Sequence, residues 1–359
     1  MKIIHCSDIH LDSGMETNLP PKKARERNYE LRLTFARMIS YAKENGVSVI
    51  MIAGDLFDTE RVSSDTSSFV LDEMRGAPDM DFLYLRGNHD ESRRAFAAQE
   101  LPENLKLFSD EWRYYEYGDT VIAGIEMNRE NSMTMYDSLH TEPGKTNIVM
   151  LHGQESTQKG EELVCISELR GKNIKYLALG HLHSFRKQKL DVDSEYCYCG
   201  CLEGRGFDEC GEKGFVLLDV KDGTVRTEFI PFAKRTLHDI TVDITGKTTE
   251  SEIRAAIQAE AQTAGVPPED MVKFTLHGEY TPETNKDISF LQKRLENDYY
   301  FVKIKDETRL HIEKGSYEND ISLKGEFIRS VMASDLSEDE KDKIICLGIA
   351  ALSAEEIRI

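Results

Sequence analysis

The sequence predicts an α/β fold in which helices flank a layered β-sandwich, with a smaller C-terminal α/β cap domain. Short β-rich runs alternate with helical patterns through the first half of the chain, and closely spaced β segments follow Gly180. A second, shorter alternation of strands and helices begins after residue 232. Strands separated by helices are typical of sheets that are covered by helices.

The first half of the chain contains the candidate strands of the main sheets. An amphipathic stretch after the first strand indicates a long helix, because its apolar residues recur at helical spacing. Two further segments, 65–75 and 161–170, also have helical patterns. The candidate strands are residues 2–7, 47–53, 81–86, 120–127, 147–152 and 174–180, and the apolar residues of the long helix are Leu31, Phe35, Met38, Ile39 and Ala42.

The segments after Gly180 indicate antiparallel hairpins. Asp222 and Gly223 form a turn signal between the last two of them. The first domain is therefore predicted to span residues 1–232. The hairpin segments are residues 186–192, 195–200, 214–220 and 224–230.

Two smaller parts follow, a cap domain over 233–310 and a helical segment over 311–359. Ser337 and Glu340 form a capping box that opens the last helix. That helix either docks a partner or packs on the core. The cap has predicted strands at 239–244, 271–280 and 299–306 and helices at 251–265 and 287–297, and the last helix has an apolar stripe of Ile344, Leu347, Ala351 and Leu352.

Composition bounds the class of protein. No apolar stretch approaches the length of a membrane span, and the N-terminal residues lack the pattern of a signal peptide. With an odd count of 7 cysteines, we expect reduced thiols, a cytoplasmic location and no membrane association. The net charge of −20 opposes nucleic-acid binding unless a local basic face, bound cations or a partner supplies the contact.

Polar residues gather where the predicted strands end. His181 and His183 are two residues apart, so they point the same way as the chain leaves a strand. Two imidazoles held together favour a shared metal environment. Open α/β sheets assemble sites at strand ends, so we expect all these side chains to converge. They are Asp8, His10, Asp55, Asp58, Asn88, His89, His152, His181 and His183.

The types of side chain fit a centre with two metal ions. One carboxylate can bridge cations held about 3.5–4 Å apart. Mixed imidazole and oxygen ligands suit Mn, Fe or Zn, whereas Mg or Ca favour oxygen ligands alone. We expect two divalent ions, with Mn²⁺ first and Fe or Zn as alternatives.

The motifs SDIH, GDLFD, GNHD, an isolated His–Gly and GHLH occur in this order. In these motifs and in their order the chain resembles the calcineurin-like metallophosphoesterases. HLDS, GDLFD, GHLH and EGRGFDECGEKG resemble the bacterial SbcD and YhaO-type DNA repair exonucleases. The phosphoesterase motifs cover about residues 1–232, and the likeness implies the metallophosphoesterase form of the layered fold.

The resemblance also implies roles for the strand-end residues. A first metal site is formed by Asp8, His10, Asp55 and His183, and Asp55 bridges to a second metal site formed with Asn88, His152 and His181. His89 is implied as the catalytic histidine, and Asp58 as the carboxylate that pairs with it. We name these sets the first and the second metal site.

The implied activity is metal-dependent hydrolysis of phosphodiesters by a two-metal-activated hydroxide. The main hypothesis is an exonuclease or endonuclease of DNA repair that acts on DNA ends or single strands. Its implied partners are a second copy of the chain, as a homodimer, and an SMC-like ATPase. The alternative is a small-molecule phosphodiesterase or phosphatase, for example on nucleotides. An inactive scaffold is disfavoured because every ligand position is filled.

Three other motifs have competing interpretations. The stretch CYCGC (197–201) fits core packing better than a zinc or iron–sulfur site, because it lacks CxxC pairs. PGKT (143–146) is not a P-loop, because Leu139 stands where glycine is required. The basic run KKARER (22–27) is either a solvated helix face or a contact for DNA phosphates.

Overall fold

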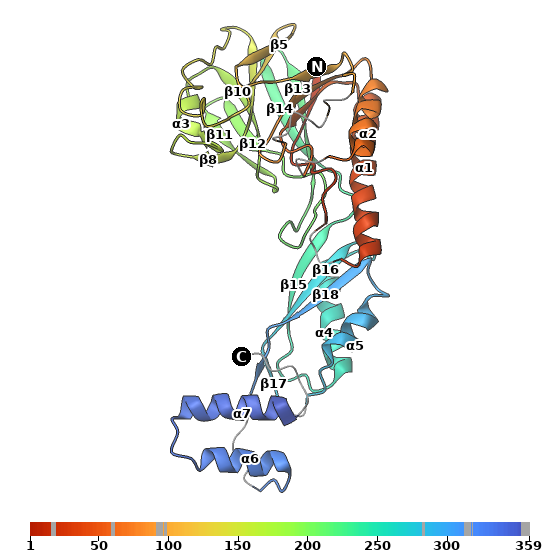
Figure 1. Ribbon diagram of the computed structural model, residues 1–359, viewed down its shortest axis with the longest axis vertical. Helices are drawn as coiled ribbons and strands as arrows, with labels where there is room; N and C mark the ends of the chain where they lie inside the picture. Colours follow the sequence, from red (N-terminus) through yellow and green to blue (C-terminus); the bar gives the residue numbers. More distant parts are fainter. Residues whose placement is uncertain are drawn as a thin grey trace. The chain divides into compact units, whose positions relative to one another are not determined.

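In the computed structural model the chain folds into two compact units, Met1–Leu237 and His238–Ile359 (Figure 1). It describes all residues except 16–18, 59–61, 91–95, 97–98, 282–283, 312–316, 318 and 353–359. The architecture is α/β, as predicted. The finer division into three domains at residues 232 and 310 stays a prediction.

The first unit contains two six-stranded sheets. In both of them parallel central strands are extended by antiparallel ones, and the segments after Gly180 pair as the predicted hairpins. The first sheet has the order β14 (Thr224–Pro231), β13 (Gly214–Lys221), β1 (Lys2–Cys6), β2 (Val47–Ala53), β3 (Asp81–Leu85) and β4 (Leu105–Leu107). The second has the order β11 (Arg186–Asp191), β12 (Ser194–Tyr198), β10 (Ile174–Gly180), β7 (Thr146–His152), β6 (Thr120–Gly124) and β5 (Arg113–Tyr117).

The main core lies between the two sheets. Met51 of β2 and Met150 of β7 belong to one buried cluster that draws residues from both sheets. Because side chains alternate along a strand, Ile50 and Ile52 point to the opposite face of the first sheet. Cys197 and Cys199 are buried in the cluster between the sheets, as the packing interpretation of CYCGC predicts.

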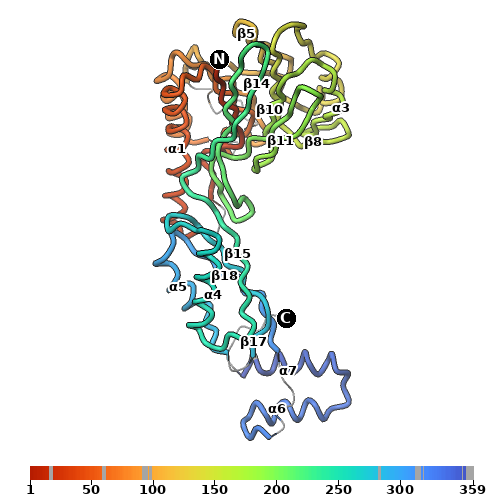
Figure 2. Tube along the Cα trace, turned by 180° about the vertical axis from the view of Figure 1, so that it is seen from behind, coloured from red at the N-terminus to blue at the C-terminus, as the bar shows by residue number. Residues whose placement is uncertain are grey.

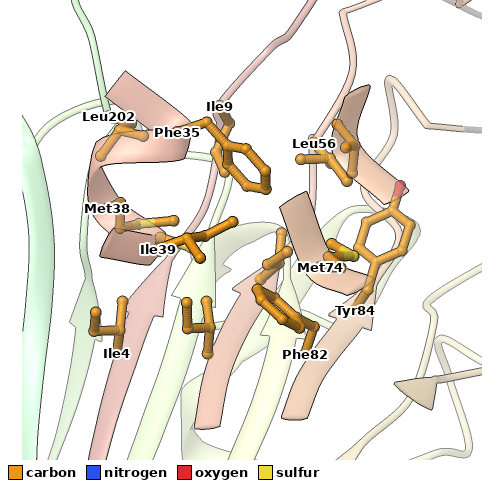
Figure 3. Packing of buried hydrophobic residues seen from close by; sticks show 14 of the residues in the cluster. Ile4, Ile9, Phe35, Met38, Ile39, Leu56, Met74, Phe82, Tyr84 and Leu202 are labelled. Carbon is orange, nitrogen blue, oxygen red and sulfur yellow. The ribbon is translucent and has the colours of Figure 1, made fainter. Parts of the chain in front are cut away.

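Two helices cover the outer face of the first sheet: α1 (Pro21–Glu44) and α2 (Ser64–Arg75). Phe35 of α1 and Met74 of α2 pack with Phe82 of β3 in one buried cluster (Figure 3). Each such side chain contributes about 1.5–3 kcal/mol when fully buried. The side chain of Ser63 accepts a hydrogen bond from the amide of Thr66, which fixes the start of α2.

The outer face of the second sheet is covered by shorter elements. The helix predicted at 161–170 is wrong for its first half. Residues Leu163–Cys165 form strand β9, which pairs with β8 (Gln154–Ser156), and only Ile166–Leu169 form a helix, α3. The amide of Gln154 donates to the carbonyl of Glu162, and this long-range pairing overrides the local helical pattern.

The second unit has a three-stranded sheet in the order β15 (Leu237–Asp243), β16 (Met271–His277) and β18 (Phe301–Asp306). Helices α4 (Glu250–Thr263) and α5 (Ile288–Leu295) share one buried cluster with this sheet. Two short strands, β17 (Glu279–Tyr280) and β19 (Arg309–Leu310), pair beside it.

Two more helices complete the second unit, and they lie side by side in both views: α6 (Leu323–Met332) and α7 (Glu338–Leu352) (Figures 1 and 2). Ile345 and Ile349 of α7 are buried against α6. The apolar stripe is not the face that packs on α6, since Ile344 and Leu347 are 38% and 39% exposed. Ala351 and Leu352 are exposed as well. Among the described residues no helix is long and apolar enough to cross a membrane.

Candidate metal centre

The two sheets approach each other closely where β2 and β10 end. A Cβ atom on Gly180 would lie 1.9 Å from the carbonyl oxygen of Ala53. A Cβ atom on Gly54 would lie 2.0 Å from Nδ1 of His152, at the end of β7. Only glycine fits at these two positions, so the strand ends of both sheets converge on one place.

The backbone turns sharply at several predicted ligands. Asp8, His10 and Asp55 each have a φ of 51°, and His181 has a φ of 104°. A left-handed backbone costs free energy for residues other than glycine and persists only where the surroundings enforce it. Here the amide of Asp8 donates to the carbonyl of Gly54 (3.0 Å), and the amide of His10 donates to that of Asp55 (3.0 Å). These contacts turn the loops after β1 and β2 into the centre.

The first metal site brings together residues that are far apart in the sequence. Asp8, His10 and His183 each offer a ligand atom within 4.8 Å of the others. Nε2 of His10 lies 3.2 Å from Nε2 of His183, which lies 3.7 Å from Oδ1 of Asp8. Asp55, the predicted bridge, has Oδ2 3.8 Å from Nε2 of His10.

The second metal site lies on the other side of Asp55. Nε2 of His152 is 3.4 Å from Oδ2 of Asp55 and 2.9 Å from Oδ1 of Asn88. The His152 ring lies against His181, with 5.5 Å between the ring centroids. The amide of His181 donates to both carboxylate oxygens of Asp8 (3.0 and 3.1 Å). All seven predicted ligands therefore lie around one centre, while their assignment to two ions stays a prediction.

His89 lies at the exposed rim of this centre. Its amide donates to Oδ1 of Asp55 (2.9 Å), and its ring stands edge-on to that of His10, with centroids 4.9 Å apart. Its Nδ1 lies 3.3 Å from the backbone carbonyl of Asp58, so it is the donor in that contact. The Asp58 carboxylate points elsewhere: it lies 2.9 Å from Nδ1 of His10 and 2.6 Å from a guanidinium nitrogen of Arg205. His10, Asp58 and His89 have ligand atoms within 4.8 Å of one another, and the implied pairing of Asp58 with His89 stays a prediction.

The donor set fits divalent cations. Oδ1 of Asp58 lies 2.9 Å from Nδ1 of His10, and Oε1 of Glu209 lies 2.6 Å from Nδ1 of His183, so each carboxylate favours the tautomer with hydrogen on that Nδ1. In these tautomers both Nε2 atoms present lone pairs to each other at 3.2 Å. Nδ1 of His152 donates to the carbonyl of Ala53 (2.9 Å), so its Nε2 lone pair also faces oxygen acceptors. Lone pairs that converge in this way repel each other unless a cation lies among them.

The electrostatics favour positive charge at the same place. Burial opposes ionisation of Asp55, but a hydrogen bond and the charge of His152 outweigh it and lower the pKa of this carboxyl. Burial opposes protonation of His152, and the hydrogen bond to Asp55 outweighs it and raises the pKa of this imidazole to about 9. Burial and the charge of His152 lower the pKa of His181. A proton and a divalent ion therefore compete for Nε2 of His152.

Three charged residues of the site lay outside the predicted set. Asp90 accepts the amides of Leu56 (3.0 Å) and Phe57 (2.9 Å) and thereby joins the GDLFD loop to the GNHD loop. Its burial raises the pKa of this carboxyl to about 6. Glu209 and Arg205 come from the EGRGFDE stretch, whose charged residues among glycines were the signal that could have found them.

The chain is similar in sequence to known metallophosphoesterases. The model of the calcineurin-like phosphoesterase family matches residues 1–185. The uncharacterized metallophosphoesterase YhaO of Bacillus subtilis is 30% identical over 64% of this chain, which spans only 60% of YhaO. The DNA double-strand break repair protein Mre11 of Sulfolobus acidocaldarius is 23% identical over 96% of this chain and 94% of its own length.

Among solved structures, a dimetal phosphatase from Danio rerio is similar over 62% of this chain and 93% of its own, with 12% identity and a TM-score of 0.40. The family match covers more than half of the sequence and includes six of the nine predicted site residues before residue 100, together with His152, His181 and His183. The chain therefore belongs to the calcineurin-like phosphoesterases, metal-dependent hydrolases with a dinuclear metal site.

Proposed function

We propose that the protein is a DNA nuclease, an exonuclease or endonuclease of DNA repair that hydrolyses phosphodiester bonds. The observation that carries this proposal is the extent of the similarity to the DNA double-strand break repair protein Mre11. That similarity covers 96% of this chain, so it continues through the second unit and beyond the phosphoesterase motifs. A shared metal centre alone would not distinguish a nuclease from a phosphatase, because one fold hosts many substrates.

In this proposal Asp8, His10 and His183 hold the first metal ion, Asn88, His152 and His181 hold the second, and Asp55 contacts both. When bound, the two divalent cations supply Lewis acidity and lower the pKa of a water molecule toward neutrality. The carboxylates of Asp8 and Asp55 bring two negative charges to a centre that would take up two divalent cations. The loaded site is locally positive, and this favours an anionic substrate despite the net charge of −20.

His89 is proposed to transfer the proton to the leaving oxygen. Its Nδ1 is directed to the carbonyl of Asp58, so Nε2 is the nitrogen left to hold the transferable proton. The side chain is exposed and lies beside the ligands, where a bound phosphodiester can reach it. A general acid in this position contributes typically 10²–10⁴-fold to the rate.

The alternative function, a small-molecule phosphodiesterase or phosphatase, is supported by a pocket beside the second metal site. A cavity of about 210 Å³ is lined by Asn88 and His152 together with the carboxylates of Asp110, Glu161 and Glu162. Its volume suits a single small substrate. The high net negative charge favours this alternative too.

One experiment separates the two functions. The full-length protein loaded with Mn²⁺ is assayed on end-labelled duplex DNA, single-stranded DNA, a cyclic nucleotide and a phosphomonoester. The nuclease proposal predicts cleavage of DNA that His89→Ala abolishes, so that a contaminating nuclease is excluded. Turnover of the small substrates alone would refute the nuclease proposal and support the alternative.

The resemblance noted in the sequence also suggests partners. We propose that the protein forms a homodimer and acts with an SMC-like ATPase subunit. Light scattering of the purified chain tests the first part, with a mass of twice 40.9 kDa as the expected result. Stimulation of DNA cleavage by the ATPase and ATP tests the second part.

A further inference from the structure

A single guanidinium joins the two carboxylates behind the first metal site. Arg205 lies 2.6 Å from Oδ1 of Asp58 through one terminal nitrogen and 2.9 Å from Oε1 of Glu209 through the other. The amide of Arg205 also donates to Oε2 of Glu209 (2.7 Å). The planar fork of an arginine can hold two carboxylates in a fixed relation, which the point charge of a lysine cannot do.

Each of these carboxylates contacts a different histidine of the first metal site. Asp58 lies 2.9 Å from Nδ1 of His10, and Glu209 lies 2.6 Å from Nδ1 of His183. A carboxylate on Nδ1 fixes the tautomer and the ring orientation of a ligand histidine and makes Nε2 a better donor to a metal. Both Nε2 atoms then face the centre of the site.

The loop that carries Arg205 is itself anchored in the first unit. Arg27 of α1 is buried, and it donates to the carbonyl of Gly204 (2.9 Å) and to Oε2 of Glu203 (3.1 Å). At the other end of the loop, Nζ of Lys213 donates to the carbonyl of His183 (2.8 Å). The loop is therefore fixed on both sides of the guanidinium.

We infer that Arg205 and Glu209 are positioning residues that clamp His10 and His183 into the geometry of the first metal site. Two ligands that are far apart in the sequence are thereby oriented by one loop. The inference rests on the dinuclear site of the family and is independent of the proposed DNA substrate.

The clamp acts on one metal site only. In the second site, Nδ1 of His152 donates to the backbone carbonyl of Ala53, which no change in the loop removes. Asn88 contacts His152 directly. Loss of the clamp is therefore expected to weaken the first metal site and to leave the second one intact.

The test measures the binding of Mn²⁺ to the full-length protein by calorimetry, with electron paramagnetic resonance to separate coupled from isolated ions. The variants are Arg205→Ala, Arg205→Lys, Glu209→Ala and Glu209→Gln. Asp208→Asn is the matched control for the glutamate, because Asp208 is an exposed carboxylate in the same loop. The control for the arginine is Arg186→Ala, which removes an arginine of β11 that pairs with Glu155 of β8.

We expect the alanine variants to bind one Mn²⁺ with the affinity of the unaltered protein and the other 10–100-fold more weakly. In the electron paramagnetic resonance spectrum, the signal of two coupled Mn²⁺ ions should then be replaced by that of one isolated Mn²⁺ ion. Glu209→Gln and Arg205→Lys should lose less affinity for Mn²⁺, because each variant keeps one part of the interaction. Both control variants should bind two Mn²⁺ ions with unaltered affinity.

Two results would overturn the inference. Unchanged affinity for both ions in Arg205→Ala and Glu209→Ala would show that the loop orients no ligand. Equal weakening of both ions, together with a lower unfolding temperature of the metal-free protein, would show a general structural role. Neither result bears on which phosphodiester the enzyme hydrolyses, because no substrate is present in the measurement.

Discussion

Arg27 offers a quantitative test of the contact between α1 and the loop that carries Arg205. The sequence left the basic run at 22–27 open between a solvated face and a DNA contact, yet Arg27 is only 1% exposed. It lies 3.1 Å from Glu203 and 2.5 Å from Glu30. The perturbation is Arg27→Met, which keeps much of the volume of the side chain and removes the charge and the hydrogen bonds.

The size of the effect follows from what the substitution leaves behind. Glu203 is also 1% exposed, and after the change it keeps hydrogen bonds from the Thr34 hydroxyl (2.7 Å) and the Lys234 amide (2.5 Å). Breaking a buried ion pair by removing one partner costs about 3–5 kcal/mol. For a unit of this size each kcal/mol corresponds to about 2–4 °C, so the unfolding temperature should fall by roughly 6–20 °C.

The assay is thermal and urea unfolding of the full chain, followed by circular dichroism, with Arg25→Met as the control. Arg25 lies in the same basic run and is exposed, so its loss should change the free energy of unfolding by less than about 0.5 kcal/mol. Adding Glu203→Gln to Arg27→Met should recover part of the loss, because it removes the uncompensated charge. A free energy of unfolding of Arg27→Met within about 1 kcal/mol of that of the unaltered protein would show that the buried ion pair does not stabilise the fold.

Three further predictions concern the centre and the second unit. His89→Ala should abolish turnover while metal content, measured by mass spectrometry, stays unchanged; retained turnover would contradict its role as proton donor. Gly180→Ala should give little folded protein on expression, because its Cβ would lie 1.9 Å from the carbonyl of Ala53, and normal yield with full metal content would contradict this packing. Burial opposes ionisation of Asp306, but a hydrogen bond from Lys286 lowers the pKa of this carboxyl. This stabilisation is therefore present above about pH 4 and is lost as the pH falls further. In Asp306→Asn the free energy of unfolding should therefore depend less on pH below about pH 4.

The strand ends made the metal centre predictable from the sequence. Asp8, Asp55 and Asn88 each follow an apolar run, and parallel strands bring such positions to one edge of a sheet. His152 and His181 follow strands of the other sheet, and Gly180 lets the two edges meet. The positions of the predicted ligands are thus set by features that are local in the sequence.

The orienting residues could not be predicted in the same way. Glu209 and Arg205 contact the site because their loop is held by Arg27, which lies 177 residues before Gly204 in the sequence. The contacts of the Asp58 carboxylate with His10 and Arg205 could not be predicted for the same reason. No periodicity or motif spacing encodes these long-range contacts.

Short apolar patterns were insufficient in two places. The segment 161–170 has a helical pattern, but pairing of β8 with β9 converts its first half to a strand. Helix α7 has apolar residues on two faces, and periodicity cannot tell which one is buried. The structure buries Ile345 and Ile349 and leaves Ile344 and Leu347 of the predicted stripe exposed.

Anomalous diffraction from crystals grown with Mn²⁺ would show whether the seven side chains hold two divalent ions. We predict two anomalous peaks about 3.5–4 Å apart, with the carboxylate of Asp55 in contact with both. One peak should adjoin Asp8, His10 and His183, and the other Asn88, His152 and His181. A single peak, or peaks away from these residues, would contradict the account.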